Sequence, residues 1–181
     1  FAVRPRLVPQ QNWYHLYLPS PYHLTHGKRN PIAAWLDSRF GIYGLHSREK
    51  YVPNLVFQQT DLDISLFLQH LWSTDGCIHV SKKKILGPKV SIYYASGSER
   101  FVRDVAHLLL RLGILTKIGT TSKAGYKDMW HVAIQGKAMQ MRFLSLVGSV
   151  GKKAERAKHA LTVLERIKEN PNIDVLPKQL W

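Results

Sequence analysis

The feature that most constrains the fold is an apolar segment that ends in one acidic residue followed by glycine. Its apolar positions follow the three- and four-residue spacing of a helix with one buried face: Ile64, Phe67, Leu68, Leu71 and Trp72. Asp61 or Asp63 is expected to cap the start of this helix, and Gly76 to end it. Asp75 would then lie at the foot of a buried helix, where a carboxylate costs free energy unless something pairs with it. A divalent metal ion is one such partner; a simple turn is the alternative.

The chain is strongly basic, with 26 Lys and Arg against 12 Asp and Glu and a formal charge of +14. This balance favours a polyanionic partner such as DNA, RNA or an anionic membrane. A membrane partner is disfavoured, because no apolar run is long enough to cross a bilayer and the N-terminus lacks the zones of a signal peptide. Charge alone leaves a ribosomal-type protein or a merely soluble surface open. The lone Cys77 allows no internal disulfide, which predicts a reducing compartment, the cytoplasm.

Downstream of Asp75 the sequence predicts alternating hairpins and helices. Strand periodicity marks residues 77–81, 89–94, 114–121 and 126–135, and helical periodicity marks 98–112, 137–147 and 152–169. A charged turn is expected over 82–88, a capping Ser98 before the second helix and Gly113 at its end. From residue 63 the order is therefore α-β-β-α-β-β-α-α. This order predicts an α+β fold with an antiparallel sheet.

The first 62 residues echo the later part of this unit. In both 12–18 and 129–134, a Trp opens an alternating strand and a His stands close behind it, and a basic loop follows further on. Coincidence is the alternative. The echo predicts a partial first repeat over 1–62, with a strand, a helix and a basic loop, and a complete second repeat over 63–181.

Residues 68–76 resemble the dodecapeptide of the LAGLIDADG homing endonucleases, since both leucines and the final acid-glycine pair match. Residues 50–57 resemble the lysine-proline-phenylalanine block before the second dodecapeptide of intein-encoded members. Residues 109–114 resemble the leucine-glycine-isoleucine step after the second long helix. The tail over 174–181 resembles the point where such insertions rejoin the splicing domain. The chain is identified as a member of this family, most similar to the endonuclease part of inteins in replicative DNA helicases.

The resemblance implies an enzyme that cuts long, asymmetric, specific sites in double-stranded DNA. Two pseudo-symmetric α-β-β-α-β-β-α repeats meet through their dodecapeptide helices, and their antiparallel saddle-shaped sheets lie along the major groove. Each repeat supplies one acid, and Mg²⁺ bridges these acids and the scissile phosphates. A complete enzyme of this kind is expected to be a monomer with two repeats. The first dodecapeptide helix and its acid are expected before Phe1, which puts cutting by these 181 residues alone in doubt. No self-splicing is expected.

The chemistry of phosphodiester hydrolysis suits these residue types. A metal ion polarises the phosphate and lowers the pKa of a water, and Mg²⁺ prefers hard oxygen ligands. Asp75 and Gly76 are therefore the expected metal site. A nearby lysine stabilises developing negative charge. The resemblance assigns that catalytic role to Lys50 through its block, with Lys152 or Lys153 as the counterpart in the second repeat; a solvated basic helix start is the equal alternative for these two.

Recognition of DNA would fall to the polar faces of the strands, because a two-stranded ribbon fits the major groove. The expected base-reading residues are His79, Ser81, Lys89, Ser91, Tyr93, Lys117, Thr121, Lys127 and His131. The expected phosphate contacts are Lys82, Lys83, Lys84 and Lys123, with Lys28 and Arg29 in a basic insert that either grips DNA or is solvated. Two other functions stay open: a catalytically inactive nucleic-acid-binding relic or maturase-like regulator, and a basic structural RNA-binding protein.

Overall fold

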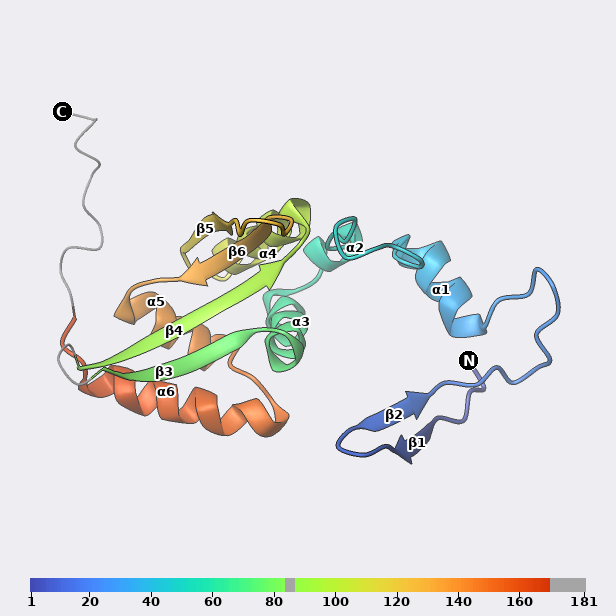
Figure 1. Cartoon of the computed structure of the whole chain (residues 1–181), viewed down its shortest axis with the longest axis horizontal. Coiled ribbons are helices and arrows are strands. Elements are labelled where there is room, and N and C mark those ends of the chain that lie inside the picture. The colour runs from blue at the N-terminus through green and yellow to red at the C-terminus, as the bar shows by residue number, and fades with distance from the viewer. Residues whose placement is uncertain (84–86, 170–181) are drawn as a thin grey trace. The chain divides into compact units, whose positions relative to one another are not determined.

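The chain folds as two units, Phe1–Leu45 and His46–Trp181. The structure, a computed structural model, describes residues 1–83 and 87–169. The predicted tail over 174–181 and Lys84 therefore lie outside the described residues. In the second unit the elements are α2 (Asn54–Phe57), α3 (Asp61–Thr74), β3 (Cys77–Lys83), β4 (Gly87–Ser96), α4 (Glu99–Arg111), β5 (Thr116–Thr121), β6 (Met129–Ile134), α5 (Lys137–Leu146), a 3-10 turn η1 (Gly151–Lys153) and α6 (Ala154–Arg166), as Figure 1 shows.

The sheet of the second unit has the strand order β3-β4-β6-β5, and every neighbouring pair is antiparallel. The predicted α+β class and the predicted order from α3 to α6 are confirmed. The β3–β4 hairpin is longer than predicted. A turn was expected over residues 82–88, but Lys82 pairs with Pro88 and Lys83 pairs with Gly87. Backbone strand pairing therefore extends the hairpin beyond its apolar residues.

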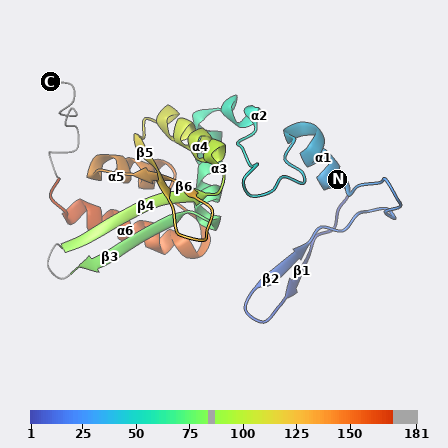
Figure 2. The same ribbon diagram turned by 45° about the horizontal axis from the view of Figure 1, so that its top comes forward.

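Helices cover one face of this sheet, as Figures 1 and 2 show. The inward side chains of the strands, such as Ile92 and Val132, pack with fully buried helix residues such as Trp72 and Phe143. Gln140 of α5 is a buried polar residue, and its amide nitrogen donates to the carbonyl oxygens of Val90 (3.2 Å) and Ile134 (3.0 Å). This amide therefore satisfies backbone groups of β4 and β6 where the sheet meets the helix.

Helix ends are set by specific caps. The prediction that Asp61 or Asp63 caps α3 is wrong: Thr60 is the cap, and its hydroxyl accepts from the Asp63 N–H at 3.2 Å. The same hydroxyl donates to the Asp63 carboxylate at 2.6 Å. Thr60 therefore bonds both the backbone and the side chain of Asp63 in the first turn of α3. The predictions for α4 are confirmed, because Ser98 accepts from the Phe101 N–H and Gly113 follows the last turn with φ 70°.

The first unit contains a hairpin and one helix: β1 (Arg6–Pro9), β2 (Tyr14–Tyr17) and α1 (Pro31–Phe40). The predicted strand over 12–18 corresponds to β2, and β1 pairs with it antiparallel. Asn30 caps α1 by accepting from the Ile32 N–H at 2.9 Å. Among the described residues, no helix is long and apolar enough to cross a membrane.

Candidate functional site

Asp75 occupies the C-terminal end of α3, where its backbone N–H donates to the Leu71 carbonyl at 3.2 Å. Its side chain is exposed, and no group in the described part of the chain donates a hydrogen bond to its carboxylate or forms an ion pair with it. Tyr94 is the titratable neighbour: burial, and then the negative charge of Asp75, raises the pKa of Tyr94 to about 12. The carboxylate therefore faces solvent beside a phenol that stays neutral at physiological pH.

Gly76 permits the close turn from α3 into β3. A methyl group added to its Cα would lie 2.5 Å from two indole carbons of Trp72 and 2.6 Å from the Trp72 Cα. Gly76 is not among the glycines with positive φ. The helix ends where predicted, but the glycine is required by this close approach and not by a left-handed conformation.

Lys153 binds the end of α3 through its ammonium group. Its Nζ donates to the carbonyl oxygens of Thr74 and Gly76 at 2.7 Å each and of Trp72 at 3.2 Å. A lysine ammonium has three protons, so these carbonyls use its full donor capacity. Helix C-termini leave carbonyls unpaired and carry partial negative charge, which a cation stabilises. Lys153 thus fixes the backbone on both sides of Asp75, whereas Lys152 is exposed.

A ladder of polar side chains joins the rest of α3 to the segment before α6. Ser65 donates to the Leu146 carbonyl, and Gln69 Nε2 donates to the Val147 carbonyl at 2.9 Å. Ser73 Oγ accepts from the Val150 N–H at 2.8 Å. The three α3 residues are four positions apart, so they share one face of the helix. This connection, residues 146–153, therefore holds α3 along its length.

The Lys50 segment is fixed to α4. The Lys50 carbonyl accepts from Ser98 Oγ at 2.6 Å, and the Val52 N–H donates to Asp104 Oδ2 at 2.9 Å. Arg111, at the other end of α4, donates to the Phe57 and Gln59 carbonyls. The backbone around Lys50 is thus held, while the side chain of Lys50 is exposed.

The residues expected to read bases lie on one outward face of the sheet, with one exception. Cross-strand pairs such as His79 with Ser91 and Ser81 with Lys89 fix this face, because side chains alternate along a strand. The predicted residues on it are His79, Ser81, Lys89, Ser91, Tyr93, Lys117, Thr121 and His131. Lys127 lies instead between β5 and β6, next to the turn that holds Lys123.

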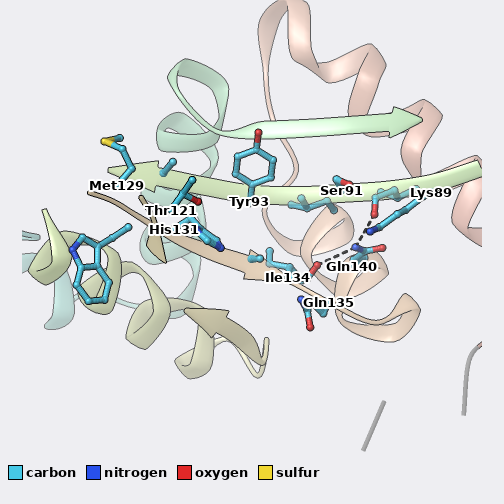
Figure 3. A pocket seen from close by; sticks show the side chains of 14 residues that line it. Lys89, Ser91, Tyr93, Thr121, Met129, His131, Ile134, Gln135 and Gln140 are labelled. Carbon is cyan, nitrogen blue, oxygen red and sulfur yellow. Dashed lines mark hydrogen bonds between the residues drawn. The ribbon is translucent and has the colours of Figure 1, made fainter. Parts of the chain in front are cut away.

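A hollow of about 400 Å³ lies on the sheet over β4 and β6, and Figure 3 shows the side chains that line it. Five predicted residues contribute to it: Lys89, Ser91, Tyr93, Thr121 and His131. Sequence reasoning missed Ala95, Ala133 and Gln135, although strand alternation gives them when it is continued by one step for Ala95 and Ala133 and by two for Gln135. The His131 ring lies close over Gly119, where a Cβ would meet Nε2 at 2.7 Å. The hollow is thus lined by the small residues Ala95 and Ala133 together with polar and larger apolar residues.

The other predicted phosphate contacts belong to several different segments of the chain. The backbone of Lys82 and Lys83 belongs to β3. Lys123 is exposed, with its Nζ 4.8 Å from the centre of the Tyr126 ring. In the first unit, the Arg29 guanidinium forms an ion pair with Asp37 and lies 5.2 Å from the Tyr43 ring centre. Arg29 is therefore engaged within its own unit.

Metal ligands are sparse around Asp75. Within residues 1–83 and 87–169, no group of three or more His, Cys, Asp or Glu side chains is arranged to hold a metal ion. The carbonyl oxygen of Gly76, the second expected ligand, accepts a hydrogen bond from Lys153. The Asp75 carboxylate is thus an accessible oxygen ligand for a metal ion at this end of α3.

Residues 63–148 match the family model described as a LAGLIDADG-like domain, a range that runs from α3 through α5. Residues 63–148 therefore form a LAGLIDADG-like domain, as the dodecapeptide resemblance predicted.

Replicative DNA helicases are among the relatives found at the sequence level. The chain is 41% identical over 181 residues to the replicative DNA helicase DnaB of Synechocystis sp. and 42% identical over 183 residues to that of Nostoc sp.. Each alignment covers 99% of this chain and 20% of the relative, so the chain spans about a fifth of the length of these proteins. A crystal structure of the homing endonuclease I-CvuI in complex with a DNA target aligns with 57% of this chain and 66% of its own, at 16% identity and a TM-score of 0.35.

Proposed function

We propose that this chain is the endonuclease part of an intein in a replicative DNA helicase. It binds a long, asymmetric site in double-stranded DNA and hydrolyses phosphodiester bonds with Mg²⁺. The observation that carries the proposal is the accessible carboxylate of Asp75 at the end of α3, inside a LAGLIDADG-like domain. The match to a DnaB segment supports the intein assignment, and the single cysteine favours the cytoplasm.

The residues at the end of α3 fit a magnesium ion. Mg²⁺ is commonly held by one or two protein carboxylates together with phosphates and waters, so one accessible aspartate per repeat suffices. When bound, the metal polarises the scissile phosphate and lowers the pKa of the attacking water. Asp75 would be the ligand from this chain. Lys153 keeps that carboxylate in place by holding the carbonyls on both sides of it.

The exposed face of α3 suits a second repeat. Leu62 is 80% exposed and Leu66 is 51% exposed, and His70 follows four residues later on the same face. Apolar side chains at this spacing are suited to pack against another helix. Such packing would bring a second acid next to Asp75, in keeping with a complete enzyme that is a monomer of two repeats.

The outward face of the sheet would contact the bases. Tyr93 is 40% exposed, and Lys89 and His131 supply a cation and an imidazole beside the hollow. Lysine and histidine N–H groups donate to acceptors on base edges, and the major groove presents a distinct pattern for each base pair. Lys50 and Lys152, both exposed, are the remaining cations that we propose for phosphate or water near the cleavage site.

The test is cleavage of a plasmid that carries the helicase gene without the segment encoding this chain. The protein is supplied with its flanking sequence, and cleavage is measured with and without Mg²⁺. Asp75→Asn is expected to abolish cutting and to spare DNA binding, because the neutral amide is a poor Mg²⁺ ligand. Asp128→Asn, which removes an exposed acid from a loop, is the matched control and is expected to cut normally.

Three outcomes would contradict the proposal. Normal cutting by Asp75→Asn would remove this carboxylate from the mechanism. Specific DNA binding without any nicking by the intact protein would favour an inactive DNA-binding relative, and preference for folded RNA would favour a structural RNA-binding protein.

A further inference from the structure

A second hollow, outside the site described above, lies between the edge of the sheet and α6. β3 is an edge strand, and α6 runs beside it, as Figures 1 and 2 show. The hollow measures about 330 Å³ and is lined by Ile78, His79 and Val80 of β3 and by Arg156 and His159 of α6. Below, these five residues are called the β3–α6 groove. The three polar residues that line it, His79, Arg156 and His159, all have side chains with nitrogen donors.

The positions of the residues along α6 explain why two basic residues lie next to β3. Ala157, Ala160 and Leu164 form the buried face of the helix. Arg156 and His159, three positions apart, lie on the flank next to β3. The carboxylate of Glu155 lies in an ion pair with Lys158 at 3.1 Å, and neither residue lines the groove. The β3–α6 groove therefore has positive character with no carboxylate in its lining.

One guanidinium and two imidazoles favour the binding of an anion. A guanidinium presents a planar fork that matches the oxygens of phosphate, and an imidazole offers at least one N–H in either protonation state. A metal cation is disfavoured, because two imidazoles are too few ligands for a closed site and the arginine repels it. Phosphate is the anion whose tetrahedral oxygens can accept from donors that converge from a strand and a helix.

We propose that the β3–α6 groove binds a backbone phosphate of duplex DNA. This inference rests on the proposed function, and it adds a contact from a helix behind the sheet to those expected from the strands. His79 belongs to the outward face of the sheet and also lines the groove, so it joins the two surfaces. A duplex lying on the outward face would present phosphates at the edges of the sheet, and β3 is one of its two edge strands. The groove would fix the position of the duplex and carry no sequence information.

The experiment measures the affinity of the protein, again supplied with its flanking sequence, for the duplex target by fluorescence anisotropy at several salt concentrations. Arg156→Ala and the double change Arg156→Ala with His159→Ala remove the helix side of the groove. Lys158→Ala is the matched control, since it removes one positive charge from the same helix outside the groove. All three positions are exposed, and circular dichroism checks that each variant folds.

Loss of one phosphate contact predicts about tenfold weaker binding for Arg156→Ala and a salt dependence shallower by about one, whereas Lys158→Ala binds like the unchanged chain. Equal affinities for Arg156→Ala and Lys158→Ala would overturn the groove while leaving the proposed function standing. Failure of the unchanged chain to bind the duplex would instead contradict the proposed function itself.

A second measurement identifies the source of the phosphate. NMR signals of the His79 and His159 rings are followed during addition of the duplex, and separately of inorganic phosphate at constant ionic strength. Shifts with the duplex that Arg156→Ala suppresses support the proposal. Shifts with inorganic phosphate that the duplex does not displace would show a site for a free anion and would overturn the assignment to DNA.

Discussion

Replacement of Lys153 by methionine tests how the end of α3 is held. Methionine preserves the length and the apolar stem of the side chain and removes the ammonium that donates to three carbonyls. The matched control is Lys152→Met at the neighbouring position. Lys152 is exposed, and no group in the described ranges forms a hydrogen bond or an ion pair with its ammonium.

The magnitude follows from the contacts. A hydrogen bond to a charged group contributes a net of about 1.5–3 kcal/mol, and three such bonds from one ammonium do not add. Water can replace the ammonium at the carbonyl of the exposed Thr74, but less easily at Trp72 and Gly76, which are buried. We therefore expect Lys153→Met to lower the free energy of unfolding by about 3 kcal/mol. Lys152→Met should change it by less than about 0.5 kcal/mol, as is usual for exposed substitutions.

Urea unfolding followed by circular dichroism and tryptophan fluorescence measures both values. A loss of about 3 kcal/mol corresponds to a melting temperature lower by about 6–12 °C for a chain of this size. Hydrogen exchange shows where the structure is destabilised, because the amides in the last turn of α3 should exchange faster in Lys153→Met. Equal unfolding midpoints for the two variants would refute the reasoning, since the three carbonyl contacts would then contribute nothing.

Two further changes test the surroundings of Asp75. Gly76→Ala should lower the free energy of unfolding by about 2–3 kcal/mol, because the new methyl group overlaps Trp72 and its backbone cannot rotate away; thermal melting measures this, and unchanged stability would contradict the close approach. Burial and Asp75 raise the pKa of Tyr94 from 10.0 to about 12, so the folded state keeps a proton that the unfolded state loses. The resulting stability is present below pH 10 and is lost as pH rises to 12, by at most about 2.7 kcal/mol. Urea midpoints across this range should fall less steeply for Tyr94→Phe, and identical slopes would refute the assignment.

Local sequence signals predicted the order of elements from α3 to α6. In α4, Ser98 and Gly113 bracket an apolar pattern with helical spacing, so both ends followed from residues next to the helix. In the sheet, a period of two fixes which side chains share a face once one residue is placed. That is why eight of the nine expected base-reading positions lie on one surface, and why Lys127, which lies outside a strand, does not.

Long-range partners could not be predicted in this way. Lys153 stands 77 residues after Gly76, and a basic residue before a helix gives no local indication that its ammonium binds another helix end. The cap of α3 was misplaced for a smaller reason: three oxygen-bearing residues, Thr60, Asp61 and Asp63, stand together, and their order alone does not select one. The β3–α6 groove likewise depends on a strand and a helix that meet only in the folded chain.

The stability of Asp75→Asn separates a functional carboxylate from a structural turn. The C-terminal end of a helix is its negative end, so Asp75 adds a like charge there, and Lys153 offsets the carbonyls without bonding to the carboxylate. The neutral amide should therefore stabilise the chain by about 0.3–1 kcal/mol in the absence of metal. Thermal melting at low ionic strength, with Asp128→Asn beside it, measures this gain, which added salt should reduce. A loss of stability would mean that the Asp75 carboxylate is needed by the turn itself. A gain would mean that the chain retains an unfavourable charge at the position where a cation would be bound.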